Sequence, residues 1–482
     1  MKVAELACEM SAGDFGDARL NKRAEKMADL LAQFPNMSIP AALKSKADIE
    51  AAYRFFNNDS VNPDRILAGH IEATHRRIDA VDFVLLVQDT TEIDLTRPQQ
   101  QVQGAGPMDC ESRRGAFFHP MLAFDSAGVP LGIVAHKSWT REAISKAPKA
   151  EKAEARRKTP IEHKESYRWL EGLQAAEQTA AACPQTTCVC VGDSESDIYE
   201  VFAAAIGSGQ KNLHLIVRAG QNRNTTEDQD WVDQVRQSDK IGEQSVRIRA
   251  RVAKIGTTAK SARSRPREAR VAELEIRKAT LQLRRPIHGD CHLPESIQIN
   301  VVLCEELNPP EGADPIRWML VTTLPIDTDA DVQRVILAYC VRWQIEVYFR
   351  TLKSGCKIES RRFETLGPVL NCLAFYSVIA WRVMYVCHLG RESPEIDCEV
   401  IFEASEWKSV YAILGEAIPT EGRPSLNDVV RAIARLGGFM NRPNDHPGTQ
   451  TLWIGLQRSY DLSNAWNTFG PGSKNFSPRP DV

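Results

Sequence analysis

The chain has 482 residues, with 60 Lys and Arg against 63 Asp and Glu and a formal net charge of −3. This length predicts about three domains. Its 43% hydrophobic and 26% charged residues are typical of a globular protein, which excludes long disorder. The near-neutral total also argues against a protein that coats DNA by bulk attraction, although it leaves room for local basic surfaces.

Nothing in the sequence predicts export or a membrane partner. The first residues lack an apolar stretch behind a positive start. The longest mainly apolar stretches are 81–87, which is too short to span a bilayer, and 373–389, which Arg382 interrupts. The 12 cysteines include no C-x-x-C pair, which favours buried free thiols over a metal site. We therefore expect a reduced, cytoplasmic protein.

The start of the chain predicts a small helical unit. Residues 17–34 carry an apolar stripe at helical spacing, and Asp17 is placed to cap them. A second helix is expected from Ser45, which has Asp48 at capping-box spacing, and a third over about 64–78. The first helix also carries a basic stripe, which is either a solvated face or a DNA contact: Arg19, Lys22, Arg23 and Lys26.

Two apolar runs, 81–87 (interrupted only by Asp82) and 187–191, predict buried strands. Each is followed by an acidic residue, Asp89 after the first run and Asp193 after the second. Further strands are expected on both sides of a hairpin turn at 125–128, at 213–218 and at 317–323.

The window 247–285 holds 13 Lys and Arg and three Glu, a net charge of +10 that leaves −13 for the rest of the chain. Its edges alternate as strands do, and its middle, 261–267, predicts a loop. The pattern indicates a β insertion with a cationic tip. We favour nucleic-acid contact over a solvated loop, because thirteen like charges repel without a partner.

A long helix is predicted over about 329–354. Tyr339, Arg342, Glu346 and Lys353 are spaced by 3, 4 and 7 residues, so on a straight helix they project within an arc of about 60°. A carboxylate flanked by two cations and a phenol fits a surface that binds a metal and several phosphates. An exposed helix with an i,i+4 ion pair explains the spacing equally well.

Asp89, Asp193 and Glu346 are the acids best placed for chemistry. Carboxylates at strand ends converge at the carboxyl edge of a sheet, and oxygen ligands suit Mg²⁺. Two such ions about 3.5–4 Å apart can activate a nucleophile and stabilise the leaving oxygen of a phosphodiester. Taken singly, each acid is more often a surface charge. Four neighbouring acids compete for the assignment: Glu92, Asp94, Glu195 and Asp197.

The pattern Tyr-x2-Arg-x3-Glu-x6-Lys, which starts at Tyr339, resembles the motif of bacterial cut-and-paste DDE transposases of insertion-sequence family four. Together with both aspartates at their strand ends, the motif is highly specific. The resemblance covers nearly the whole chain. Further segments match the family in order: 52–55, 89–91, 193–197, 217–218, 306–310 and 434–440.

The resemblance implies an α/β protein with an RNase H-like catalytic core and a β-strand insertion. An N-terminal helical DNA-binding domain and a C-terminal helical dimerisation region would flank this core. The implied boundaries are 1–70 for binding of transposon ends, 71–370 for catalysis with the insertion at about 225–316, and 371–482 for dimerisation, ending in a flexible tail.

The resemblance also assigns roles to side chains. Asp89, Asp193 and Glu346 would be the catalytic triad and the metal ligands, holding two Mg²⁺ ions that Mn²⁺ can replace. The phosphates near the cleaved end would be gripped by Tyr339, Arg342 and Lys353. The remaining DNA contacts would be Trp318 and Trp343, stacked around a flipped base, and Arg218, Arg19 and Arg23 along the end DNA.

Some of these assignments have open alternatives. Both tryptophans can instead be core residues, and for Trp343 the two interpretations weigh about evenly. The chain also departs from the family, because residues 115–119 replace a tryptophan pair and Ser194 replaces a basic residue. These changes bear on detailed DNA contacts and not on the triad.

We expect a metal-dependent transposase that cleaves transposon ends through a hairpin and joins them to target DNA. Its partners would be double-stranded DNA, as inverted-repeat ends and target, and a second copy of the chain in a synaptic complex at the bacterial nucleoid. Two alternatives remain: another RNase H-like nuclease, or a catalytically silent DNA-binding relic.

Overall fold

The computed structural model describes residues 9–10, 13–43, 45–97, 99–143, 147–227, 229–248, 268–287 and 290–471. The chain divides into two compact units. We call Met1–Lys146 with Trp343–Val482 the split unit, and Ala147–Arg342 the middle unit. The predicted basic tip at 261–267 and the predicted tail lie outside the described residues.

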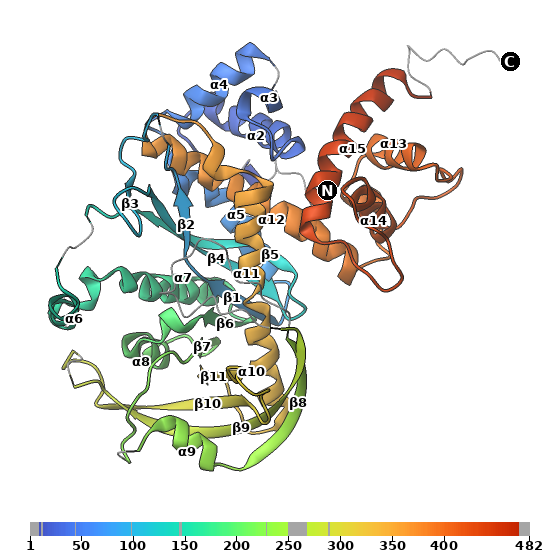
Figure 1. Cartoon of the computed structure of the whole chain (residues 1–482). Helices are drawn as coiled ribbons and strands as arrows, with labels where there is room; N and C mark the ends of the chain where they lie inside the picture. The colour runs from blue at the N-terminus through green and yellow to red at the C-terminus, as the bar shows by residue number, and fades with distance from the viewer. Residues whose placement is uncertain are drawn as a thin grey trace. The chain divides into compact units, whose positions relative to one another are not determined.

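The N-terminal part of the split unit contains helices α2 to α5 (Figure 1); three of them lie where the sequence predicts a helix, and the short α3 was not predicted. Asp17 caps the first of them, since its carboxylate accepts a hydrogen bond from the Arg19 amide at 2.8 Å. Ser45 accepts from the Asp48 amide in the same way before the third. The helices are α2 (Ala18–Gln33), α3 (Ile39–Leu43), α4 (Lys46–Phe56) and α5 (Pro63–Ile78).

In the split unit, β4 (Arg114–Asp125) pairs antiparallel with four other strands. The run FVLLVQ forms β1 and is buried from its second residue on, as a continuous apolar run predicts. The expected hairpin turn at 125–128 joins β4 to β5, with Gly128 at φ 86°. The partners of β4 are β1 (Phe83–Gln88), β2 (Thr91–Asp94), β3 (Gly106–Pro107) and β5 (Pro130–Trp139).

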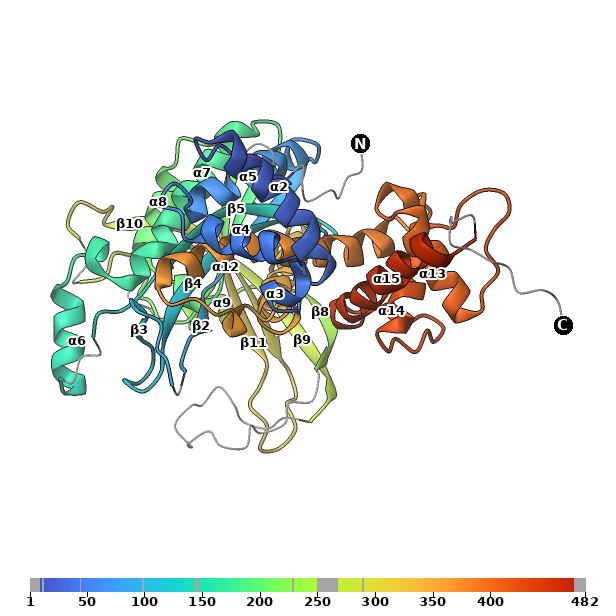
Figure 2. The same cartoon turned by 90° about the horizontal axis from the view of Figure 1, so that it is seen from above.

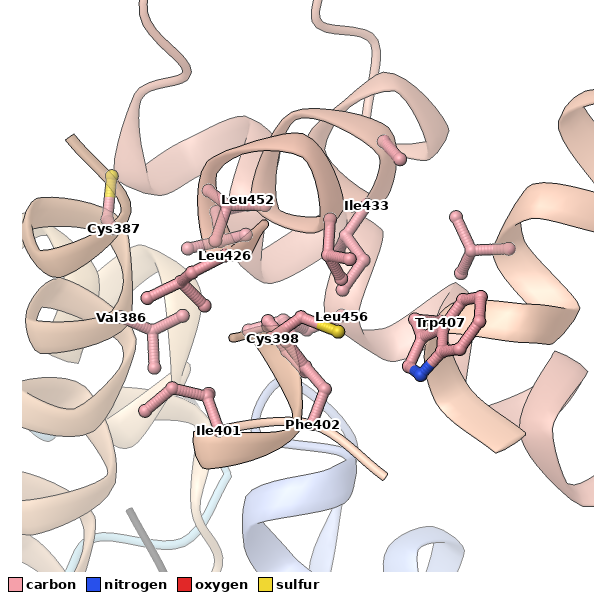
Figure 3. Packing of buried hydrophobic residues seen from close by; sticks show 14 of the residues in the cluster. Val386, Cys387, Cys398, Ile401, Phe402, Trp407, Leu426, Ile433, Leu452 and Leu456 are labelled. Atoms are coloured by element: carbon pink, nitrogen blue, oxygen red, sulfur yellow. The ribbon is translucent and has the colours of Figure 1, made fainter. Parts of the chain in front are cut away.

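The rest of the split unit is helical. It contains α11 (Gln344–Arg350), a π-helical turn Thr351–Gly355, short 3-10 turns Ile358–Ser360 and Cys398–Val400, α12 (Leu366–Glu392), α13 (Ala404–Leu414), α14 (Leu426–Leu436) and α15 (Thr449–Phe469). The last three helices lie side by side in Figures 1 and 2. Figure 3 shows their apolar core, in which Leu426, Ile433 and Trp407 are at most 1% exposed.

One helix, α12, is long and apolar enough to cross a membrane by length and composition alone. Its most apolar window is 89% buried within the protein, as in the core helix of a globular protein. Arg382 lies in this helix and donates to the Tyr460 hydroxyl at 3.3 Å.

In the middle unit, a parallel pair continues into an antiparallel sheet: β6 with β7, then β11, β10, β9 and β8. Helices α7 and α8 pack on β6 and β7, and α9 packs on β9 and β10 (Figure 1). The strands are β6 (Thr187–Gly192), β7 (Leu213–Arg218), β8 (Lys240–Ile248), β9 (Arg270–Arg284), β10 (Ser296–Glu306) and β11 (Arg317–Thr322). The helices are α6 (Lys149–Lys158), α7 (Arg168–Ala182), α8 (Tyr199–Gly207), α9 (Trp231–Gln237) and α10 (Asp329–Val341), with 3-10 turns at Ile161–His163, Glu165–Tyr167 and Ser194–Ser196.

The prediction of a single helix over 329–354 is wrong. Helix α10 ends at Val341 and α11 starts at Gln344. Between them the backbone tightens, because the amide of Arg342 donates to the carbonyl of Tyr339, three residues back rather than four. Neither Gly nor Pro marks the break. The shared-face projection assumes one regular helix, and it stays a prediction because Tyr339 and Arg342 belong to the middle unit while Glu346 and Lys353 belong to the split unit.

Candidate active site

Asp89 directly follows β1 and is half-buried. Its Oδ1 accepts a hydrogen bond from the Thr90 amide at 2.7 Å. Behind it lies His119 on β4, only 4% exposed, with Nδ1 2.8 Å from the Thr90 hydroxyl and Nε2 3.0 Å from Gln88 Oε1. His119 thus holds the residues on both sides of Asp89. In the sequence, His119 stands out only as part of the segment 115–119 that differs from the family. No motif or spacing in the sequence connects it with Asp89.

Asp193 follows β6 and is also half-buried. It caps a short 3-10 turn, where Oδ1 accepts from the Glu195 amide at 2.7 Å. Arg218 ends the neighbouring parallel strand β7 and donates to the Ser194 hydroxyl at 3.2 Å. A side chain at Gly220 would lie 2.8 Å from Ser194 Cβ, so this glycine lets the loop after β7 approach the Asp193 turn.

Tyr339 and Arg342 belong to the middle unit, as Asp193 does. The Arg342 guanidinium lies 5.7 Å from the centre of the Tyr339 ring, and Trp318 on β11 packs against the same ring at 6.5 Å. Burial raises the pKa of the Tyr339 phenol, although the nearby charges of Arg342 and Arg218 partly oppose this shift. The middle unit therefore gathers one acid, two cations and a phenol around the end of β6.

A hollow of about 530 Å³ adjoins this cluster in the middle unit. Ser194 and Gly220 lie on the side of the Asp193 turn, and the start of α9 lies opposite. Its charged lining residues are Arg218, Arg236, Arg317, Asp230 and Asp233. The hollow gives an extended polar chain, such as a nucleic-acid backbone, room beside Asp193.

Glu346 is exposed on α11 of the split unit. Lys353 follows in the π-helical turn, 3.7 Å from the carboxylate of Glu359. Glu359 in turn accepts from the Asp94 amide at 3.0 Å, which ties this turn to β2. Lys357 has φ 50°, a left-handed conformation that is strained for a residue other than Gly. The backbone around Lys353 is thus irregular and braced by side chains.

The four acids that compete with the triad for the metal-ligand assignment all form ion pairs with arginines. Arg113 binds Glu92 at 3.1 Å and Asp94 at 2.9 Å, Arg168 binds Glu195 at 2.7 Å, and Arg223 binds Asp197 at 2.5 Å. Burial would raise the pKa of Asp94, but its bonds from Thr96 and Arg113 outweigh burial and lower it. By contrast, no cation lies within ion-pair distance of Asp193 or Glu346 among the described residues.

The predicted triad is divided between the units. Asp89 and Glu346 belong to the split unit, with Lys353, Trp343, Arg19 and Arg23, while Asp193 belongs to the middle unit. Trp343 is 63% exposed, so the core-packing alternative for this residue is wrong. Arg19 is exposed at the start of α2 and pairs with Asp17 at 3.0 Å, and Arg23 lines a shallow hollow on the same helix.

The basic window 247–285 is only partly described, and several of its cations have partners within the protein. Arg270 binds Glu306 at 2.8 Å and Arg277 binds Glu275 at 2.7 Å. Lys278 donates to the carbonyls of two loop residues at 2.6 Å. The argument that these charges repel without an external partner is therefore wrong for the described strands. For residues 249–267 it stays untested.

Three family models match the chain in order. "Transposase DNA-binding" matches residues 5–61, "Transposase DDE domain" matches 172–373, and "Transposase Tn5 dimerisation domain" matches 378–464. With the α/β middle unit and the helical C-terminal region, these matches define a DDE transposase. The chain belongs to the Tn5-like members of this class, which confirms the predicted domain order and fold class.

One solved structure, titled "Cryo-EM structure of piggyBac transposase synaptic complex with hairpin DNA", also resembles the chain. It is 11% identical in sequence, covering 98% of this chain and 80% of that one, with a TM-score of 0.35. At this distance the likeness carries no argument about the site. Asp193 and Glu346 lie inside the DDE match, while Asp89 precedes it.

Proposed function

We propose that this transposase moves its element by a metal-dependent cut-and-paste reaction that passes through a DNA hairpin. The observation that carries the proposal is the ordered set of DNA-binding, DDE and dimerisation matches, together with two acids, Asp193 and Glu346, that pair with no arginine among the described residues. The four acids that compete with the predicted triad are each paired with an arginine, which supports Asp193 and Glu346 as the acids available to ligands.

Asp89, Asp193 and Glu346 would hold two Mg²⁺ ions, and Mn²⁺ could replace them. Carboxylate oxygens fit such hard cations, and ligands at strand ends leave coordination positions open for water and phosphate. Bound there, the ions would activate the attacking hydroxyl and stabilise the leaving oxygen.

The other side chains would hold the DNA. Tyr339, Arg342 and Lys353 would bind phosphates next to the cleaved bond, since guanidinium and ammonium groups form charge-assisted hydrogen bonds to phosphate oxygens. Trp318 and Trp343 would stack on a base flipped from the hairpin, replacing lost base stacking. Contacts along the end DNA would come from Arg218, Arg19 and Arg23.

The reaction would take four in-line displacements at one site. Water attacks the phosphodiester at the end of the element, and the freed 3′-hydroxyl attacks the opposite strand to close a hairpin. A second water opens the hairpin, and the 3′-ends then attack target DNA. In the first and third steps water forms the new P–O bond and a 3′-hydroxyl is released, and in the second and fourth steps one 3′-hydroxyl displaces another, so no covalent enzyme intermediate is required.

Residues 1–70 would bind the inverted-repeat ends, 71–370 would carry catalysis, and 371–482 would hold two copies together in the synaptic complex. This work would take place in the bacterial cytoplasm, at the nucleoid.

The test is a cleavage and joining assay with the inverted repeats that flank the gene, in Mg²⁺, in Mn²⁺ and in a chelator. We expect a labelled hairpin and joined products with either metal and neither product in the chelator. Asp89→Asn should abolish both products and leave end binding within about twofold. Cutting without end specificity or joining would identify another nuclease, and binding without cutting in any metal would identify a silent relic.

A further inference from the structure

Arg361 is a buried guanidinium that joins distant segments of the split unit. It is 4% exposed, and it donates to the carbonyl oxygens of Met37, of Pro35 at 2.5 Å and of Cys356 at 2.6 Å. Its plane lies over the Tyr376 ring of α12 at 4.2 Å. Among the described residues, no carboxylate lies within ion-pair distance of Arg361.

A buried cation usually faces a carboxylate that offsets the cost of leaving water. Here the hydrogen-bond acceptors are backbone carbonyls, and the planar fork can satisfy several of them only while they keep fixed positions. Arg361 therefore constrains the chain segments that carry these carbonyls.

The segments belong to different parts of the proposed machinery. Pro35 and Met37 connect α2, the helix with the basic stripe, to α3. Cys356 closes the π-helical turn, since its amide donates to the Thr351 carbonyl at 2.8 Å, and Lys353 lies inside that turn. π-helical turns are rare and mark functional sites more often than ordinary helical turns do.

A hollow of about 520 Å³ lies between these segments. One wall consists of residues of the α2–α3 connection, and the other of residues that follow the π-helical turn. Arg361 lines the hollow, and its hydrogen bonds go to residues next to those of both walls, since Pro35 and Met37 flank Asn36 and Cys356 precedes Lys357. Because the walls are not packed together throughout, the bonds of Arg361 set how they are spaced.

We propose that Arg361 is a positioning residue that ties the N-terminal end-binding helices to the π-helical turn carrying Lys353. Docking of a transposon end on α2 then fixes the position of a lysine that holds the phosphate next to the cleaved bond. This inference rests on the proposed function, because it assigns Lys353 and α2 to the same DNA.

The test compares Arg361→Lys with Arg97→Lys in the full-length protein. Lysine keeps the charge but offers a single ammonium group that cannot reproduce the planar fork. Arg97 is a matched control, because it donates to the carbonyls of Arg361 and Phe363 in the same loop without reaching residues 35–37. Three quantities are measured: affinity for end DNA, the rate of metal-dependent nicking, and amide hydrogen exchange of residues 351–357 with and without end DNA.

In wild type and in Arg97→Lys, we expect end DNA to slow exchange of residues 351–357. In Arg361→Lys the slowing should vanish and nicking should fall roughly tenfold to a hundredfold, the cost of a small misplacement near the chemistry. End affinity should change by less than about twofold. The inference is overturned if Arg361→Lys keeps the DNA-dependent slowing, or if nicking and affinity fall together. Failure of the wild type to bind or nick would instead overturn the proposed function.

Discussion

The segments that follow the C-terminal ends of β1 and β6 both contain acids that pair with arginines, but the two segments differ in how these arginines are arranged. After each strand comes one acid assigned to the metal site, Asp89 or Asp193, and then further acids that arginines neutralise. After β1, a single half-exposed arginine, Arg113, serves the neighbouring acids. After β6, each neighbouring acid has its own buried arginine.

The difference shows how one strand end can combine reactivity with stability. Asp197 is 0% exposed and accepts from the amides of Gly220 and Gln221 at 2.8 Å as well as from Arg223. It therefore fixes the loop that faces the Asp193 turn. Four residues apart, one carboxylate is committed to structure and the other is left for a ligand.

The contrast between acids left for a ligand and acids paired with arginines predicts its largest effect, a loss of nicking, at Glu346. Glu346→Gln should lower nicking at least about a thousandfold, because the variant loses a charged metal ligand whose role is in the transition state. The urea midpoint should stay unchanged, since Glu346 is exposed and pairs with no described cation. Nicking at the wild-type rate would remove Glu346 from the triad.

Replacement of Asp197 is expected to lower the unfolding free energy strongly, and not only the rate of nicking. Asp197→Ala leaves Arg223 buried without its anion, which should cost about 3–5 kcal/mol of unfolding free energy. Urea denaturation measures the loss, and Asp193→Asn is the matched control that should stay close to the wild-type midpoint, because the amide oxygen of Asn can still accept from the Glu195 amide. Equal midpoints for the two variants would break the division between structural and ligand acids.

A smaller effect is expected at His119, behind Asp89. His119→Ala removes one hydrogen-bond partner of Gln88 and one of Thr90, so the Asp89 loop should become less well positioned and nicking should fall about tenfold. The metal concentration for half-maximal nicking should rise as well. A lower unfolding midpoint with normal nicking kinetics would show that His119 only fills the core.

Much of this arrangement could be predicted from the sequence, because it depends on local signals. The apolar runs before Asp89 and Asp193 and the caps at Asp17 and Ser45 are such signals. The break after Val341 could not be predicted, since no helix-breaking residue marks it.

The ion pairs between acids and arginines could not be predicted from the sequence either. Arg113 and Arg223 are 19 and 26 residues away from the acids Asp94 and Asp197 that they bind, so only the folded chain distinguishes ligand acids from structural ones. Arg361 is a further case, since its partners at Pro35 and Met37 are more than 300 residues away in sequence.

The smallest effect is expected at Glu195, and it tests the assignment of Asp193 most directly. The Glu195 side chain is 46% exposed, so its ion pair with Arg168 should contribute at most about 1 kcal/mol. Arg168 also donates to the Glu165 carbonyl at 2.8 Å and therefore keeps a partner in Glu195→Gln. We expect nicking within about twofold of wild type and a nearly unchanged urea midpoint. If Glu195→Gln instead abolished nicking while Asp193→Asn did not, the metal ligand after β6 would be Glu195, and the arginine pairing would no longer separate ligand acids from structural ones.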